Sequence, residues 1–163
     1  MRLQPVLALL VLMSASLASC SEHSTSPTAP VPAGVAPTET DVAAFAGLVN
    51  AHRQSQGLTA LVWDPTAAAV ALAHSEDMAT RGFFSHVNPE GASPFDRMSA
   101  AGMHYSYAGE NIAYGFTGAG SVFDAWMASP GHRGNIEKGA YTHHGVGRFG
   151  THWTHIFFTP LPS

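Results

Sequence analysis

The chain has 163 residues, of which 45% are hydrophobic and 11% charged, and its formal net charge is −4. This composition is typical of a globular protein with a buried core, and it excludes an intrinsically disordered chain. The 7 basic residues form no patch, so nucleic acid is not an expected partner.

Residues 1–20 have the pattern of an export signal. Arg2 precedes a short apolar run, residues 6–13, far below the roughly 20 residues that a membrane-spanning helix needs. The segment Leu17-Ala18-Ser19-Cys20 resembles the bacterial lipobox, so we expect a lipid anchor on Cys20 that attaches the protein to the bacterial cell envelope. The alternative is cleavage nearby and a secreted protein. Cys20 is the only cysteine, so no disulfide can form within the chain.

A tether and a first helix are expected next. Residues 21–39 are rich in Ser, Thr and Pro, which predicts an extended tether, and residues 40–163 are expected to form a single domain. Apolar residues at helical spacing predict a helix from Asp41 to Gln56, with Thr40 as its N-cap.

Two further helices have clear start signals. Asp64 and Pro65 predict a helix that runs to about Thr80 and stops at Gly82. Ser93, with Asp96 three residues later, predicts a capped helix that ends near residue 102. The intervening residues 83–91 are predicted to form a loop that carries His86.

The second half of the domain is predicted to end in a sheet. A short extended piece at 105–107 precedes an expected turn at 109–111, and a helix is predicted from 121 to 128. Pro130 and Gly131 then interrupt regular structure and expose His132. Residues 145–149 and 153–159 predict a hairpin, whose second strand is apolar on both faces and therefore central. Helices followed by an antiparallel sheet predict an α+β fold.

Six motifs occur in order along the domain and support a family resemblance. They are Phe84-Ser85-His86-Val87-Asn88-Pro89-Glu90-Gly91, Pro94-Phe95-Asp96-Arg97, Gly109-Glu110-Asn111-Ile112-Ala113, the stretch from Trp126 to Ile136 with Ser129-Pro130-Gly131-His132-Arg133, Gly145-Val146-Gly147, and Trp153-Thr154. Together they resemble the bacterial, SCP-like extracellular branch of the CAP superfamily (cysteine-rich secretory, antigen 5 and pathogenesis-related proteins), over roughly residues 42–159. The resemblance implies an α-β-α sandwich with a small antiparallel sheet between helices.

The resemblance also implies a cleft. In this family two histidines and two acidic residues line it, and in some members they bind a divalent metal. Position by position, these residues correspond to His86, Glu110 and His132, while Ser129 stands where the second acid would be. Asn111 and Arg133 are expected to line the same cleft. His155 replaces a common Gln in the last strand, and is expected to be able to reach the cleft as an extra ligand.

The chemistry of the three predicted cleft residues favours binding. Two imidazoles and a carboxylate suit Zn²⁺ or a similar divalent ion, with water in the open position. Hydrolysis also needs a base near that water, and Ser129 cannot act as one at neutral pH. We therefore favour a non-enzymatic binding domain over a metal-dependent hydrolase of peptides or cell-envelope polymers. By analogy with the family, the ligand is expected to be a lipid, a sterol-like molecule or a cell-wall fragment.

Two other interpretations of the histidines stay open. His86, Glu110 and His132 could form only a buried hydrogen-bond network, in which case the protein is a structural or adhesive surface module. A second histidine group gathers near the predicted hairpin, with members His143, His144, His152 and His155. A second metal site there is the less favoured interpretation, because imidazoles spread over a turn and a strand are more often unconnected.

Overall fold

The computed structural model describes residues 37–162. The predicted signal segment, the Cys20 anchor and residues 21–36 of the tether lie outside the described residues. The elements in chain order are α1 (Pro37–Ser55), β1 (Val62–Trp63), α2 (Pro65–Arg81), α3 (Pro94–Ala100), β2 (Tyr105–Tyr114), α4 (Ala119–Ala128), α5 (Pro130–Ile136), β3 (His143–Phe149) and β4 (His152–Pro160). Within this range, no helix is both long and apolar enough to cross a membrane.

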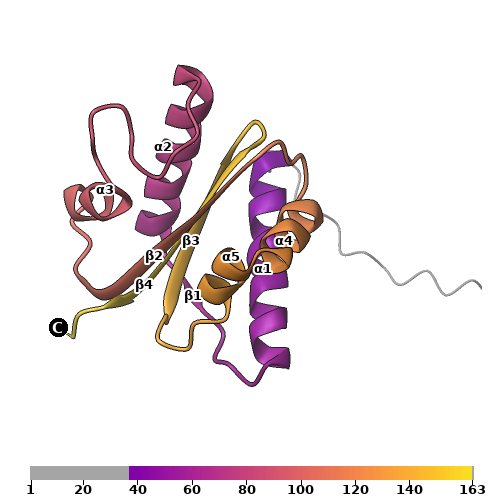
Figure 1. Ribbon diagram of the computed structural model, residues 1–163. Helices are drawn as coiled ribbons and strands as arrows, with labels where there is room; N and C mark the ends of the chain where they lie inside the picture. Colours follow the sequence, from indigo (N-terminus) through magenta and orange to yellow (C-terminus); the bar gives the residue numbers. More distant parts are fainter. Residues whose placement is uncertain (1–36, 163) are drawn as a thin grey trace, which may run out of the picture. The chain divides into compact units, whose positions relative to one another are not determined.

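A four-stranded sheet with the order β1-β3-β4-β2 lies at the centre of the domain. β4 pairs antiparallel with both β2 and β3, whereas β1 pairs parallel with β3. Figure 1 shows α2 and α3 on one side of this sheet and α1, α4 and α5 on the other. The predicted α+β fold and sandwich are therefore confirmed, with one parallel pair in a sheet that was expected to be antiparallel.

β4 contributes one face to each of two cores. Trp153 packs in a cluster with Phe45 of α1, on the α4 and α5 side of the sheet. Ile156 packs in the other cluster with Met98 of α3, on the α2 side. Residues 153–158 are all buried, which confirms the prediction of a central strand that is covered on both faces.

The two helices with clear start signals begin where the sequence predicts. The Asp64 side chain accepts a hydrogen bond from the backbone N–H of Ala67 at 2.7 Å, and α2 ends at Gly82 in the left-handed conformation. Ser93 and Asp96 form the reciprocal capping box of α3. Short-range hydrogen bonds thus determine where these helices begin.

Three predicted boundaries were wrong. α1 begins at Pro37, so Thr40 lies inside the helix, and the early Pro and acidic Glu39 suit its first turn. Residues 109–111 lie within β2 and not in a turn, because this stretch pairs with β4 along its whole length. Pro130 does not expose the next residues outside regular structure, but opens the short helix α5.

A buried arginine, which the sequence did not single out, joins α1 to the loops around α5. Arg53 is 1% exposed, and its guanidinium donates hydrogen bonds to four backbone carbonyls. These carbonyls belong to Thr59 (2.9 Å), Ile136 (2.8 Å), Lys138 (3.1 Å) and Tyr141 (3.3 Å). Burial lowers the pKa of Arg53, because the charged form loses its hydration. The four carbonyls replace part of that hydration, so Arg53 fixes the loop that leads into β3.

Candidate functional site

The first part of the predicted cleft is a histidine–carboxylate pair at the edge of the sheet. β2 is an edge strand, and Glu110 lies at its middle, opposite Ile156 of β4. His86, in the loop after α2, places its Nδ1 atom 2.8 Å from Glu110 Oε1. The Glu110 side chain is 1% exposed and that of His86 is 50% exposed. The pair therefore presents a half-exposed imidazole on a buried carboxylate.

Arg97 completes this pair and is the functional residue that the sequence interpretation missed. Its guanidinium donates to Glu110 Oε2 at 2.7 Å and to the backbone carbonyl of His86 at 2.9 Å. The Pro94-to-Arg97 motif entered the family resemblance, but Arg97 received no role. A buried carboxylate needs a charged or hydrogen-bonding partner, but the burial of Glu110 appears only in the structure, so no sequence signal assigned this role to Arg97.

Gly109 explains why the motif Gly109-Glu110-Asn111 can lie in a strand. A Cβ atom at Gly109 would overlap the hydroxyl oxygen of Tyr141, which donates a hydrogen bond to the carbonyl of Ala108 at 3.1 Å. The glycine is thus required by close packing and not by a turn.

The second predicted histidine lies on α5. His132 Nδ1 is 2.9 Å from the hydroxyl oxygen of Ser129, which stands in the second-acid position. The His132 ring lies beside Trp126, with 6.2 Å between the ring centroids. Burial lowers the pKa of His132, and the nearby His86 lowers it further.

Asn111 ties α5 to the edge strand. Its side-chain amide donates to the His132 carbonyl at 3.0 Å and accepts from the Asn135 amide at 2.8 Å. Successive side chains alternate between the faces of a strand, so Glu110 and Asn111 point to opposite sides of β2. The predicted cleft residues therefore lie on both sides of the edge strand, with the His86–Glu110 pair on one side and α5 on the other.

The other two predicted cleft residues, Arg133 and His155, have other partners in the structure. Arg133 is exposed on α5, with its Nε atom 4.0 Å from Glu137. His155 is fully buried in β4, and its Nε2 is 3.0 Å from Nδ1 of His144, which is also buried. Of the four hairpin histidines, these two form a pair, while His152 lies against the Tyr114 ring, with ring centroids 4.6 Å apart.

The histidines of the predicted cleft belong to two hydrogen-bonded pairs, His86 with Glu110 and His132 with Ser129. Within residues 37–162, no three His, Cys, Asp or Glu side chains stand together in a group that could hold a metal ion. Both oxygens of Glu110 are engaged, one by His86 and the other by Arg97. Among the ring nitrogens of the two predicted cleft histidines, Nε2 of His86 and Nε2 of His132 have no hydrogen bond to a described residue. What the cleft can offer a ligand is therefore two oriented imidazoles.

These features define a class of protein: a small α-β-α sandwich whose edge strand carries a buried glutamate paired with a loop histidine, next to a short helix that carries a second histidine. Residues 46–157 match the family model of CAP, the cysteine-rich secretory protein family. The chain belongs to this family, which confirms the resemblance seen in its motifs.

Two curated relatives come from Bacillus subtilis (strain 168). The uncharacterized protein YkwD is 42% identical over 146 residues, which make up 88% of this chain and 56% of YkwD. The uncharacterized membrane protein YlbC is 39% identical over 110 residues, 68% of this chain and 32% of YlbC. The chain thus spans only part of the length of these relatives.

Solved structures agree with the fold. An extracellular protein of Bacillus anthracis that contains an SCP domain superposes with a TM-score of 0.72 at 30% identity, over 77% of this chain and 44% of that chain. An outer surface protein from Borrelia burgdorferi also gives a TM-score of 0.72, at 20% identity, over 77% of this chain and 97% of that chain. The second likeness concerns the fold alone.

Proposed function

We propose that this protein is an exported, non-enzymatic binding protein and that the cleft at the edge of β2 is its ligand site. The observation that carries this proposal is the anchoring of two imidazoles through Nδ1, His86 by buried Glu110 and His132 by Ser129. An imidazole held through one nitrogen presents the other in a fixed direction, which lowers the entropy lost when a ligand binds.

A divalent metal ion is the first ligand to consider, and we propose a weak site held by the two histidines. Histidine ligands commonly donate their other ring N–H to a carboxylate, and the contact between His86 and Glu110 has this form. The lowered pKa of His132 keeps its ring neutral at pH 7, as a metal ligand must be. In this proposal His86 and His132 hold the ion and Glu110 orients His86. The bound ion would supply a Lewis acid for an oxygen-bearing ligand.

Binding is favoured over hydrolysis because the two acidic positions of the cleft offer no available carboxylate. Glu110 is buried and has no free oxygen to accept a proton from a water molecule, since both its oxygens are engaged. Ser129 is in contact with His132 and is not basic at neutral pH. A hydrolase would need a base within hydrogen-bond reach of the attacking water, and in this proposal both imidazoles hold the ion instead.

Exposed aromatic rings beside the cleft suggest a ligand with an apolar face. Phe84, two residues before His86, and Tyr114, at the end of β2, are exposed, with ring centroids 6.3 Å apart. Exposed aromatic patches next to polar groups are typical of binding surfaces. A lipid, a sterol-like molecule or a cell-wall fragment, each with apolar and polar portions, has the chemistry that such a surface recognises.

Metal titration tests the cleft. Isothermal titration of the untagged protein with Zn²⁺ or Ni²⁺ is expected to show one site, and His86→Ala and His132→Ala are each expected to abolish it. Glu110→Gln is expected to weaken affinity by about tenfold, because the orienting partner of His86 is weakened. The exposed His104 provides a matched control, since His104→Ala should bind like the wild type.

Melting curves separate this proposal from a structural role. A purely structural network predicts that Glu110→Gln lowers the melting temperature while metal, lipid and cell-wall fragments bind as before, or not at all. Equal metal uptake by the wild type and both alanine variants would refute the two-histidine site. A hydrolase would be favoured instead if the protein cleaved a peptide or envelope polymer and if both a chelator and the His132→Ala substitution abolished this cleavage.

Export and anchoring are proposed from the N-terminus and from the relatives. The lipobox-like segment ends at Cys20, and the similar Bacillus anthracis protein is described as extracellular. Cys20→Ala is expected to move the protein from the membrane fraction to the soluble fraction of an expressing bacterium, because a lipid chain contributes about 0.8 kcal/mol per buried CH₂ group. Unchanged membrane fractionation would contradict the anchor. As a control, mass spectrometry shows whether the signal segment has been cleaved.

A further inference from the structure

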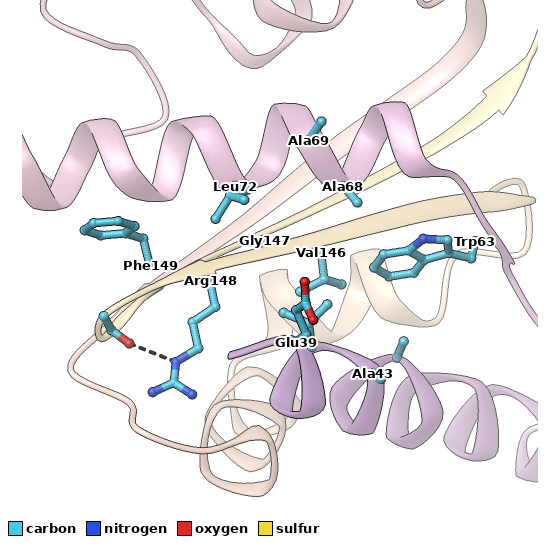
Figure 2. Close-up of a pocket in the computed structure, with 13 residues that line it drawn as sticks. Glu39, Ala43, Trp63, Ala68, Ala69, Leu72, Val146, Gly147, Arg148 and Phe149 are labelled. Carbon is cyan, nitrogen blue, oxygen red and sulfur yellow. Dashed lines mark hydrogen bonds between the residues drawn. The ribbon is translucent and has the colours of Figure 1, made fainter. Parts of the chain in front are cut away.

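A large apolar groove lies at the other edge of the sheet, away from the β2 cleft. It has a volume of about 810 Å³ and runs along β3 between α1 and α2, with walls that include Glu39, Ala43, Trp63, Leu72, Val146 and Phe149. We call it the β3 groove. Figure 2 shows β3 passing between the two helices, with Trp63 at one end and Phe149 at the other. Most of the lining is aliphatic or aromatic, with Glu39 and Arg148 as the charged members.

The floor of the β3 groove is an unpaired strand edge. β1 contains only two residues, and its pairing with β3 covers only His143 and His144. The backbone N–H of Asp64 donates to the carbonyl of His144 at 2.8 Å, so the backbone of residue 144 faces this edge. Backbone groups alternate sides along a strand, so the N–H and C=O of Val146 and Arg148 face the same edge, beyond the end of β1.

The depth of this edge limits what can pair with it. Val146 is 2% exposed, whereas Ala43 and Leu72 on the flanking helices are exposed. A second copy of the chain would have to bring its own recessed edge within about 4.8 Å, and its flanking helices would collide with these first. A single extended chain has no flanking helices, so this collision does not arise for it.

We propose that the β3 groove binds an extended peptide of about five residues, which adds to β3 as a strand. The backbone of the peptide would pair with Val146 and Arg148, while its alternate side chains would contact the helix walls. Small aliphatic side chains match walls built largely from alanine and leucine.

Charge selects among such peptides. Figure 2 shows the Glu39 carboxylate pointing from α1 toward Val146. Among the described residues Glu39 has no ion-pair partner, whereas Arg148 pairs with Asp41. The groove therefore offers one uncompensated negative charge, so the favoured peptide carries a lysine or arginine among its aliphatic residues. This inference is independent of the β2 cleft, and its test does not depend on the proposed function.

Fluorescence and hydrogen exchange test the proposal. Trp63 is 42% exposed in the groove wall, whereas Trp126 and Trp153 are buried, so a fluorescence change reports groove occupancy. We expect the peptide acetyl-Val-Ala-Lys-Val-Ala-amide to change Trp63 emission saturably and to slow amide exchange at Val146 and Arg148 about tenfold. The same peptide with N-methylated backbone amides should do neither, because it cannot pair with the strand.

Two substitutions on one helix supply the matched control. Ala43→Lys places a long side chain in the groove and is expected to weaken peptide binding about tenfold or more. Ala44→Lys changes the neighbouring exposed residue, which does not line the groove, and should leave binding unchanged. Equal binding of the N-methylated peptide, or no protection of Val146 and Arg148, would overturn the proposal. The proposal would also be overturned if a fatty acid changed Trp63 emission and the peptide did not.

Discussion

Gly147→Ala is expected to destabilise the protein by about 3 kcal/mol and to lower its melting temperature by about 10 °C. A Cβ atom at this position would overlap the backbone N and Cα of Leu72 in α2. Backbone cannot move aside as a flexible side chain can, so α2 would have to lift from the sheet. Such a shift would also disturb Ser75, whose hydroxyl donates to the Gly147 carbonyl at 3.0 Å. Thermal unfolding followed by circular dichroism measures the effect.

Gly120 provides the control for this substitution. It lies inside α4, and a Cβ atom there would meet no other atom within 4 Å. Gly120→Ala is therefore expected to raise stability slightly, by about 0.5 to 1 kcal/mol, because alanine favours the helix. If Gly147→Ala melted at the wild-type temperature, the close packing of α2 on β3 would be refuted.

Acid is expected to destabilise the protein strongly between pH 6.5 and pH 4, and the buried His144–His155 pair is the main cause. Burial lowers the pKa of His144 from 6.5 to about 4, and the positive charge of Arg53 and the nearby His143 add to this. Burial also lowers the pKa of His155 well below its usual value, and His144 and Arg53 lower it further. Both rings are therefore neutral in the folded protein.

The direction of the pH effect follows from the lower pKa of both rings in the folded protein than in the unfolded chain. In the unfolded chain both imidazoles take up protons near pH 6.5, so below that pH the unfolded state binds more protons than the folded state. Their contribution to stability is complete above pH 6.5 and is lost as the pH falls. The loss due to His144 levels off near pH 4 and amounts to about 3 kcal/mol, to which His155 adds.

Urea unfolding at a series of pH values between 7.5 and 4 measures this loss. His144→Gln is expected to remove a large part of the pH dependence, whatever its effect on stability at pH 7.5. His104→Gln, at an exposed position, should leave the pH dependence as it is in the wild type. A free energy of unfolding that stayed constant from pH 7 to pH 5 would show that the pair does not resist protonation.

The two proposed sites lie at opposite edges of the sheet. The order β1-β3-β4-β2 makes β2 one edge and places β1 with the uncovered part of β3 at the other. β4 connects them through its pairing with both β2 and β3. Substitutions in one site, such as His86→Ala or Ala43→Lys, can therefore be tested without altering residues of the other.

The sequence by itself determined the features that depend on short-range physics. The starts of α2 and α3 follow from caps that bond within three residues, and the C-terminal hairpin follows from alternation around a glycine turn. The motifs also identified the CAP family, and the family resemblance brought His86 and Glu110 together, which their hydrogen bond bears out. Each of these conclusions needs only neighbouring residues or an ordered set of motifs.

Only the tertiary structure decided which distant groups meet. Pairing with β4 made a strand of residues 109–111 despite their turn-like composition, since ladder hydrogen bonds outweigh local preference. Arg97 as the partner of Glu110 and His144 as the partner of His155 were not predicted, because no local pattern encodes a contact between separate elements. The open edge of β3 likewise depends on how closely α2 packs against the sheet, which no local pattern encodes.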